Sequence, residues 1–533
     1  MAPSAEILRT ELFADPEGKF VHDVVLESCR RHAAKIAILD ASCIPARRIT
    51  YAGYGEMVER AARGLVAAGI RPGERIAIFL PNCWEFGIAY HAATLAGAVP
   101  TTLNPTYRER EVCYQLENSG AVALITDGAL LQQGIDLSGL AALRRTYTVR
   151  TPGPSGSGPF SELLQIGARA DLPAPEQHSR LTLAALPFSS GTTGLPKGVM
   201  LSHYNLVANV YQTLTPGEHG AIAEDDVILC YLPLYHIYGL TIGLNLALIR
   251  GCTLLLMPRF DCERSLQLTV EEGVTVTLCV PPTLLAYCQA AEQGRFPRQH
   301  RLRWVKCGAA PLAPELARRF TASTGIRIRQ GYGMTEASPV THMGFLADAL
   351  YRPESVGAPV AHTDCRVVDE NGNDVAAGEL GELVMRGPQF MSGYWKSPGA
   401  SEAVLRDGWY WSGDVVRQDQ DGLYYVVDRR KEMIKYKGFS IAPAEVESVL
   451  LECPAVRDCG VVSRTDAAGE EVPCAFVVLA EGELSNQQTA ERLQAFVAER
   501  LTHYKMPREI YYLQKLPRTA SGKILRRELR KLV

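Results

Sequence analysis

The chain has 533 residues, which is too long for one ordinary domain and predicts about two or three. Apolar residues make up 47% of the chain and the formal net charge is −3, which argues against a nucleic-acid binder that relies on a basic face. The N-terminal segment lacks a basic stretch followed by an apolar one, and no run of about 18 uncharged apolar residues occurs, so we expect neither a signal peptide nor a membrane span. The 14 cysteines form no CxxC pair and lie mostly in apolar runs, as reduced thiols in the cytosol do, so we expect a cytoplasmic protein.

Apolar runs of strand length alternate with helical patterns over the first 330 residues. A strand candidate at 74–81 is followed by a helix-like segment at 84–97 and by another strand at 123–127. Continuous apolar strands separated by helices are typical of buried, mostly parallel sheets. Because there are too many strands for one sheet, we predict two stacked α/β units. The later strand candidates are 181–188, 227–233, 252–258, 274–280 and 303–309, and the later helix candidates are 203–214, 239–249, 263–272, 282–292 and 314–324.

The remaining pattern predicts an α/β fold with a large N-terminal and a small C-terminal domain. Residues 151–159, rich in Pro, Gly and Ser, are interpreted as a surface loop or linker between halves. After residue 350, an Asn-Gly turn at 371–372 and short strands with glycine turns indicate a small β-unit. The charged junction 428–440 is a reasonable hinge, because a new α+β pattern begins there. We therefore predict an N-terminal domain at 1–430, made of stacked α/β subdomains plus the β-unit, and a small mobile α+β domain at 431–533.

The glycine-rich stretch SSGTTGLPKG, residues 189–198, follows an apolar strand candidate and precedes a helix candidate. Glycines let backbone N–H groups converge, the hydroxyls add donors and Lys197 adds a positive charge, which together suit phosphate oxygens. The stretch does not match GxxxxGK[ST], and residues 331–336 lack the third glycine of a dinucleotide fingerprint. On its residues alone, the stretch is either a phosphate-binding loop of another kind or an ordinary flexible surface loop.

Four further motifs accompany this loop in a fixed order. They are QGYGMTEASP (330–339), GWYWSGDV (408–415), DRRKEMIKYKG (428–438) and RTASGKILRREL (518–529). Together the five motifs resemble the AMP-binding, adenylate-forming superfamily of acyl-CoA synthetases, luciferases and peptide-synthetase adenylation domains, and the resemblance covers essentially the whole chain. The segments PLYHIYGL (233–240), CGAAPL (307–312) and YKGFSIAPAEVE (436–447) most resemble plant-type 4-coumarate–CoA ligases and beetle luciferases.

The resemblance implies a reaction in two halves: a carboxylate attacks the α-phosphate of ATP to give acyl-AMP and pyrophosphate, and a thiol, usually that of CoA, then displaces AMP. The glycine-rich loop would hold the β- and γ-phosphates, Thr335 and Glu336 would contact the α-phosphate and Mg²⁺, and Glu336 would be the metal ligand. Tyr332 would stack on adenine, and Asp414 with Arg429 would bind the ribose hydroxyls. The implied ATP and AMP residues are Ser189, Ser190, Gly191, Thr192, Thr193, Gly194, Lys197, Gly308, Ala309, Ala310, Gln330, Gly331, Tyr332, Gly333, Met334, Thr335, Asp414, Arg429, Lys431, Lys435 and Lys523.

The resemblance also implies that Lys523 bridges the attacking carboxylate and the α-phosphate, where negative charge builds up. Since Lys523 lies on the small domain, that domain can rotate about Lys431 after adenylation and bring Lys435 to the thiol channel. The implied catalytic residues are Lys523, His236, Thr335, Glu336 and Lys435. The implied CoA residues are Arg259, Lys437, Gly438 and Phe439.

His236 matches the family's aromatic gate beside the carboxylate. The glycines of the implied acyl cavity favour a flat ring, and Tyr238 offers a phenolic partner for a ring substituent. Ile242 departs from the coumarate ligases, which commonly have a small polar residue there, and it favours a shorter or less hydroxylated acid. The implied acyl-binding residues are His236, Tyr238, Ile242, Lys306, Gly308, Gly331, Gly333, Met334, Pro339 and Val340.

We therefore predict an ATP-dependent acid–CoA ligase for an aromatic acid such as a benzoate, anthranilate, cinnamate or coumarate. The alternatives are a medium-chain fatty acyl-CoA synthetase, an adenylation enzyme that loads a carrier protein, and a luciferase-like oxygenase. Lys437 and Arg259 favour free CoA, whose phosphates a carrier arm partly lacks. The expected cofactors and partners are ATP, Mg²⁺, coenzyme A and the acid, with no nucleic acid, and the expected state is a monomer or homodimer.

Overall fold

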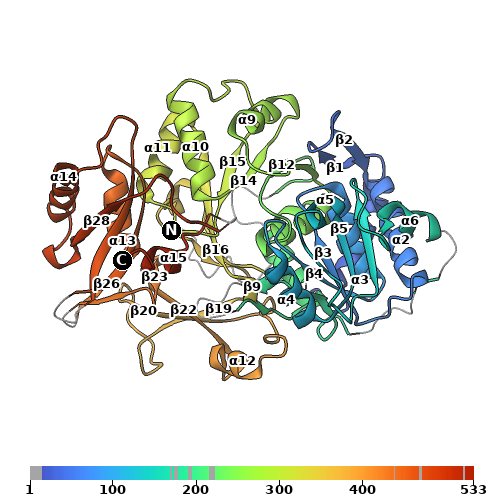
Figure 1. The fold of residues 1–533 in the computed structure, drawn as a ribbon. Coiled ribbons are helices and arrows are strands. Elements are labelled where there is room, and N and C mark those ends of the chain that lie inside the picture. Colours follow the sequence, from blue (N-terminus) through green and yellow to red (C-terminus); the bar gives the residue numbers. More distant parts are fainter. Residues whose placement is uncertain are drawn as a thin grey trace.

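The computed structural model describes most of the chain, and the ranges it describes are 15–167, 171–172, 178–189, 195–214, 222–436, 439–466, 471–519 and 522–533. Within these ranges, none of the helices combines the length and the apolar character that crossing a bilayer requires. Figure 1 shows a five-stranded sheet (cyan) at one end of the molecule and the C-terminal elements (orange to red) at the other, with a larger sheet between them.

The larger sheet has nine strands. In spatial order they are β18 (Ala358–Pro359), β17 (Val340–Met343), β16 (Arg327–Gly333), β15 (Trp304–Cys307), β14 (Val276–Cys279), β12 (Val227–Cys230), β13 (Thr253–Leu256), β1 (Ile36–Asp40) and β2 (Arg47–Thr50). The strands from β16 to β1 pair in parallel, whereas β17, β18 and β2 add antiparallel edges. The apolar sequence of β13 is buried along its whole length, as expected of a strand that is covered on both faces.

The smaller sheet is parallel throughout and consists of β4 (Val99–Thr102), β3 (Arg75–Phe79), β5 (Ala121–Asp127), β6 (Arg145–Val149) and β7 (Gly158–Pro159). Helix α3 (Trp84–Leu95) lies between the two sheets, because it contacts β3 and β4 of the smaller sheet and β1 of the larger one. Its sequence is apolar on all sides, which suits a helix without a solvent face. The prediction of two stacked α/β units is confirmed.

Residues 151–159, interpreted as a surface loop or a linker between halves, form a surface loop whose last two residues, Gly158–Pro159, are strand β7 of the five-stranded sheet. The segment ends in β7, which pairs in parallel with β6 immediately before it in sequence. A Pro-, Gly- and Ser-rich composition marks a surface loop, but it does not distinguish a loop within one sheet from a loop between domains. The linker interpretation was therefore wrong.

The apolar run 181–188 forms two short strands rather than one. Strand β8 (Leu183–Ala185) pairs with β11 (Leu201–Ser202), and β9 (Phe188–Ser189) pairs with β10 (Lys197–Gly198), both antiparallel. Pro187 lies between β8 and β9 and lacks the N–H that a continuous ladder would need.

The helix predicted at 239–249 begins as a π-helix, η1 (Tyr238–Asn245), and continues as α8 (Leu246–Arg250). Apolar periodicity over a segment this short does not separate the two kinds of helix. π-Helical turns are frequent at functional sites, and this one follows the strand β12 that leads into the cavity described below.

The other helices of the N-terminal part cover the two sheets, except for α12, which packs on the small β-unit. Two of them show clear end signals: Thr50 caps α2 by accepting a hydrogen bond from the Gly53 N–H, and Gly325 ends α11 in the left-handed conformation. These helices are α1 (Val21–Arg31), α2 (Tyr51–Ala67), α4 (Glu109–Ser119), α5 (Gly128–Leu131), α6 (Phe160–Ile166), α7 (His203–Leu214), α9 (Cys262–Glu271), α10 (Pro281–Glu292), α11 (Pro314–Thr324) and α12 (Pro398–Val404), with 3-10 turns η2 (Thr335–Ala337) and η3 (Asp348–Leu350).

The small β-unit expected after residue 350 is confirmed as a five-stranded antiparallel sheet. It runs along the lower side of the view in Figure 1. The predicted Asn-Gly turn lies at its start, where Gly372 has a φ of +85° and Val368 bridges to Asp374. The strands are β19 (Asp364–Val368), β20 (Gly381–Arg386), β21 (Leu405–Arg406), β22 (Trp409–Gln418) and β23 (Tyr424–Arg429).

The C-terminal elements have hydrophobic clusters of their own. Those clusters contain residues from Ile434 onwards, whereas the main cluster of the N-terminal part ends at Tyr424. Strand β26 pairs antiparallel with β27, and β27 pairs parallel with β28. The α+β pattern is therefore confirmed. The elements are β24 (Ile434–Tyr436), β25 (Phe439–Ile441), α13 (Pro443–Glu452), β26 (Val456–Thr465), β27 (Glu471–Leu479), α14 (Gln487–Ala498), η4 (His503–Lys505), β28 (Glu509–Tyr512) and α15 (Arg526–Arg530).

Candidate active site

A cavity of about 2890 Å³ lies where the carboxyl ends of β12, β14, β15 and β16 meet the β-unit and the C-terminal elements. Parallel strands end at the same edge of a sheet, so side chains that are far apart in sequence come together there. Most of the candidate residues that the structure describes line this cavity. They are Ser189, Lys197, His236, Tyr238, Lys306, Gly308, Ala309, Ala310, Gln330, Gly331, Tyr332, Gly333, Met334, Thr335, Glu336, Pro339, Val340, Asp414, Arg429, Lys431 and Lys523.

Three described candidates do not line the cavity. Ile242 is fully buried in η1, and Arg259 is exposed just after β13. Lys435 is exposed on β24, where its backbone N–H donates to Glu471 at 2.7 Å. The candidates Ser190, Gly191, Thr192, Thr193, Gly194, Lys437 and Gly438, and the side chain of Phe439, lie outside the described residues.

Asp414 and Arg429 are cross-strand neighbours on β22 and β23. The Arg429 Nε lies 2.6 Å from one carboxylate oxygen of Asp414, and the Tyr332 hydroxyl donates to the other at 2.5 Å. Burial, together with the charge of Asp414, raises the pKa of Tyr332 well above its ordinary value, so the phenol stays protonated and donates. The Asp414 carboxylate is thus held in a fixed orientation at the cavity wall.

Glu336 lies in the short turn η2, with 8% of its surface exposed. Its Oε1 accepts hydrogen bonds from the Ser189 hydroxyl at 3.1 Å and from the Tyr394 hydroxyl at 2.8 Å. Among the described residues, no cation forms an ion pair with this carboxylate. A nearly buried carboxylate whose partners are hydroxyl groups fits one oxygen ligand of a hard divalent cation.

Three lysines, Lys197, Lys431 and Lys523, line the same cavity as these carboxylates. Lys197 is the cross-strand partner of Ser189, and its Nζ lies 5.6 Å from the centre of the Tyr394 ring. Burial, and then the charge of Arg429, lower the pKa of the half-buried Lys523 to about 8. The pKa of Lys431 is also lowered, by partial burial and by its neighbours Arg429 and Lys197. Positive charges that destabilise one another in this way favour an anionic ligand such as a polyphosphate.

His236 also lines the cavity. Burial and the charge of Lys523 lower its pKa to about 4, so its imidazole is neutral at physiological pH. Its Nδ1 accepts a hydrogen bond from the Tyr238 backbone N–H at 3.2 Å. The ring proton must therefore sit on Nε2, which makes that nitrogen a donor toward a bound group.

The inner wall of the cavity contains a buried lysine. The Tyr238 hydroxyl donates to the backbone carbonyl of Lys306 at 3.2 Å, whereas the Lys306 Nζ contacts the Met343 Sδ at 3.8 Å. Burial, and then the charge of Arg329 on the neighbouring strand, lower the pKa of Lys306 to about 7. A thioether is a poor acceptor, so the amine is available to an acceptor on a bound ligand.

Close approach of neighbouring backbone explains why glycine is needed at two positions of the cavity wall. A Cβ on Gly333 would lie 1.9 Å from the Pro339 carbonyl oxygen, and one on Gly308 would lie 3.0 Å from the Gly331 oxygen. Side chains at Gly333 and Gly308 would therefore force apart the backbones that flank the site. Both glycines line the cavity, so backbone atoms form part of its wall there.

Sequence reasoning missed Tyr394, whose hydroxyl holds Glu336. It lies outside the five motifs, in the segment that bridges back to Val199 beside the glycine-rich loop. No spacing signal connects Tyr394 to the site, because the contact exists only in the folded chain. Pro282, at the start of α10, was missed for the same reason and lies against Gly522 next to Lys523.

Comparisons with known proteins agree with this geometry. The model of the AMP-binding enzyme family matches residues 25–395, and that of the AMP-binding enzyme C-terminal domain matches residues 445–523. The 4-coumarate–CoA ligase 5 of Oryza sativa subsp. japonica is 35% identical over 538 residues, which is 99% of this chain and 97% of the relative.

Two solved structures superpose along the whole chain. A benzoate CoA ligase from Burkholderia xenovorans LB400 gives a TM-score of 0.86 at 29% identity, covering 96% of this chain and 99% of that one. The anthranilate CoA ligase AuaEII, solved with anthranoyl-AMP, gives a TM-score of 0.87 at 24% identity, covering 98% of each chain, and this likeness concerns the fold alone.

The fold and the cavity therefore define an adenylate-forming enzyme. The chain belongs to the AMP-binding enzyme family, as its five motifs suggested. It is an AMP-forming acid–thiol ligase of the acid–CoA type.

Proposed function

We propose that this ligase activates an aromatic carboxylic acid of the benzoate, anthranilate, cinnamate or coumarate kind and transfers the acyl group to CoA. The observation that carries the proposal is a cavity wall that combines the backbone of Gly308, Gly331 and Gly333 with the neutral His236. A flat ring fits against bare backbone better than a flexible alkyl chain does. The relatives named as ligases of coumarate and benzoate agree with this substrate class.

The nucleotide would occupy a neighbouring part of the same cavity. Adenine would lie between Tyr332 and the backbone of residues 308–310, and the ribose hydroxyls would donate to Asp414. The ion pair with Arg429 supports this role, because it holds the Asp414 carboxylate in a fixed orientation. The phosphates would face Lys197, Lys431 and the glycine-rich loop.

Glu336 would supply one oxygen ligand to Mg²⁺ bound with the phosphates. When bound, this cation would neutralise phosphate charge and favour departure of pyrophosphate. Ser189 and Tyr394 would orient the Glu336 carboxylate through their hydroxyl groups.

In the first half-reaction, the acid would place its carboxylate between His236 and Lys523. The Nε2–H of His236 would orient one carboxylate oxygen. Lys523 would bridge the attacking oxygen and the α-phosphate, where charge accumulates in the transition state. Both groups line the same cavity, which supports this pairing.

In the second half-reaction, a thiol must reach the acyl-AMP that Lys523 covers. We propose that residues 431–533 rotate as a domain about Lys431, so that Lys523 leaves and Lys435 enters beside the CoA channel. The exposed position of Lys435 and the inward position of Lys523 suit the adenylation arrangement. Arg259, Lys437, Gly438 and Phe439 keep their proposed CoA roles for the second arrangement.

Pyrophosphate release tests this function directly. We would screen benzoates, cinnamates and medium-chain fatty acids with ATP, Mg²⁺ and CoA, and identify the thioester by mass. We expect an aromatic acid to give the highest kcat/KM, with free CoA as acceptor. A preference for an alkyl acid would contradict the aromatic assignment, and adenylate formation without thioester would point to a carrier protein as the acceptor.

A further inference from the structure

The loop that carries Lys523 is closed on itself by backbone contacts. Arg518 and Ile524 form an isolated β-bridge, and the Lys523 carbonyl accepts a hydrogen bond from the Thr519 N–H at 2.8 Å. The Lys523 N–H donates to the Thr519 hydroxyl at 3.1 Å. These contacts close the loop but leave its orientation on the small domain undetermined.

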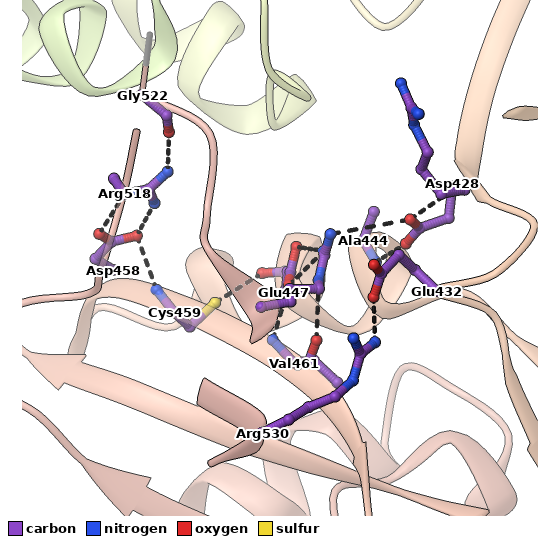
Figure 2. A network of polar contacts seen from close by, with 12 residues as sticks. Asp428, Glu432, Ala444, Glu447, Asp458, Cys459, Val461, Arg518, Gly522 and Arg530 are labelled. Carbon is purple, nitrogen blue, oxygen red and sulfur yellow. Dashed lines mark hydrogen bonds and ion pairs between the residues drawn. The ribbon is translucent and has the colours of Figure 1, made fainter. Parts of the chain in front are cut away.

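Arg518 ties this loop to strand β26. Its Nη2 and Nε donate to the two carboxylate oxygens of Asp458 at 2.7 and 3.3 Å, and its Nη1 donates to the Gly522 carbonyl at 2.6 Å. Asp458 is itself held by the Cys459 N–H at 2.9 Å. Figure 2 shows Arg518 lying between Gly522 and Asp458.

The Gly522 carbonyl belongs to the peptide bond that leads directly into Lys523. A planar peptide whose oxygen is fixed also has its N–H fixed, so Arg518 sets the direction in which the Lys523 side chain leaves the backbone. Gly522 has a φ of +82°, and a Cβ there would lie 3.2 Å from the Pro282 Cδ of α10. The peptide is thus held by Arg518 on one side and packs close to Pro282 on the other.

We propose that Arg518, oriented by Asp458, is the positioning residue that aims the Lys523 ammonium at the reacting carboxylate and α-phosphate. This inference rests on the role proposed for Lys523. The positive charge of Arg518 is matched by the bidentate Asp458 carboxylate, so Arg518 acts through geometry more than through its own charge. A fork of N–H donors is required, since one donor alone cannot serve a carboxylate and a carbonyl.

Arg526, which follows Lys523 in the sequence as Arg518 precedes it, has different partners. Arg526 donates to both carboxylate oxygens of Glu447 at 2.7 and 2.8 Å and approaches Asp428 of β23 at 4.0 Å. Figure 2 shows this second group beside the first one. Because Asp428 precedes the proposed hinge, a substitution of Arg526 would also change a contact between the two domains. The hydrogen-bond partners of Arg518, Asp458 and Gly522, both lie within the small domain. A substitution of Arg518 therefore tests the position of Lys523 without removing a contact between domains.

The test measures the two half-reactions separately. Adenylation is followed by pyrophosphate release, and thioester formation is followed from synthetic acyl-AMP and CoA. We expect Arg518→Met to lower adenylation about 10- to 100-fold, the loss expected for a reacting group displaced by about 1 Å. The rate of thioester formation should stay within about twofold of that of the unaltered chain, because Lys523 has no proposed role in that half-reaction. Arg518→Lys should recover only part of the loss.

A double variant separates positioning from general damage. In a Lys523→Ala background, Arg518→Met should lower adenylation no further, since the group that it positions is already absent. Asp458→Asn should reproduce part of the effect of Arg518→Met. As a matched control, Arg492→Met removes a surface ion pair with Glu483 elsewhere in the same domain and should leave both halves unchanged.

Two results would overturn the inference. One is an equal loss in both half-reactions for Arg518→Met, and the other is an undiminished further loss in the Lys523→Ala background. Pyrophosphate release by the unaltered chain tests the proposed function separately. If the unaltered chain releases pyrophosphate and Arg518→Met releases it at the same rate, the positioning role of Arg518 is contradicted, whereas the proposed function is supported.

Discussion

The ammonium group of Lys523 is surrounded by other cations, and its charge is correspondingly less stable. Burial and Arg429 lower its pKa to about 8, and the same ammonium helps to lower the pKa of His236 to about 4. At neutral pH the cavity therefore combines a charged amine with a neutral imidazole that donates a hydrogen bond. This combination suits a carboxylate, which needs one counter-charge and one orienting donor.

The lowered pKa of Lys523 predicts an alkaline limit to adenylation. A lysine loses its charge as the pH rises through its pKa, so kcat/KM for pyrophosphate release should fall with a midpoint near pH 8. Lys523→Arg should keep the charge and move the fall to higher pH, although with a lower maximum rate. Profiles between about pH 6 and pH 10 would check this. An alkaline limb that stays in place in Lys523→Arg would assign it to another group.

Lys306 offers a test of the substrate class. Its buried amine contacts only the Met343 thioether among the described residues, and an acid with an acceptor on its ring would complete its hydrogen bonding. We expect Lys306→Met to raise KM for a hydroxylated acid about 10-fold or more, because a site built for a polar group discriminates strongly. KM for the unsubstituted acid should change little.

Met343→Leu is the matched control for this prediction, because it removes the thioether and leaves the amine in place. It should leave KM for the hydroxylated acid nearly unchanged. Equal changes in KM for both acids in Lys306→Met would show that the amine supports the pocket without contacting the ring substituent.

Among the elements, the buried parallel strands could be predicted because each is a continuous apolar run between helical patterns. The resemblance carried by the five motifs likewise predicted that Glu336, Asp414 and Lys523 lie close together, and all three line one cavity. The π-helix could not be predicted, since a segment of 8 residues is too short to show which helical period its apolar residues follow. Nor could the roles of Tyr394 and Pro282, which depend on segments that meet only in the folded chain.

The approach of β16 to the segment that follows it gives a prediction about Gly333. A Cβ there would lie 1.9 Å from the Pro339 carbonyl oxygen, and backbone cannot move aside as a flexible side chain can. We expect Gly333→Ala to lower the free energy of unfolding by about 1–3 kcal/mol or more, as overpacking does. Thermal and denaturant unfolding would measure the change.

Gly139→Ala serves as the control for Gly333→Ala, because a Cβ on Gly139 meets nothing within 4 Å. It should leave stability nearly unchanged. If Gly333→Ala were as stable as the unaltered chain and equally active, the close approach of the two backbones would not be a requirement of the site.

In the whole molecule, two sets of hydrophobic clusters are joined by a short, charged connection. The Asp428 carboxylate, just before that connection, accepts a hydrogen bond from the Ala444 N–H at 2.9 Å and lies near Arg526. Polar contacts of this kind stabilise the arrangement with Lys523 inside the cavity. They also agree with the rotation proposed for residues 431–533, because polar contacts can be exchanged for contacts with water.

Rotation about the connection can be tested with Lys431→Pro. Proline fixes φ near −65° and stiffens the residue before it, so the backbone change needed for rotation should be blocked. If the fixed geometry suits the adenylation arrangement, one turnover of pyrophosphate should be released, whereas thioester formation and steady-state turnover should fall about 10-fold or more. Lys431→Ala removes the same ammonium without restricting the backbone, and it should retain far more turnover than Lys431→Pro. Equal steady-state rates in the two variants would mean that the chain does not turn at residue 431.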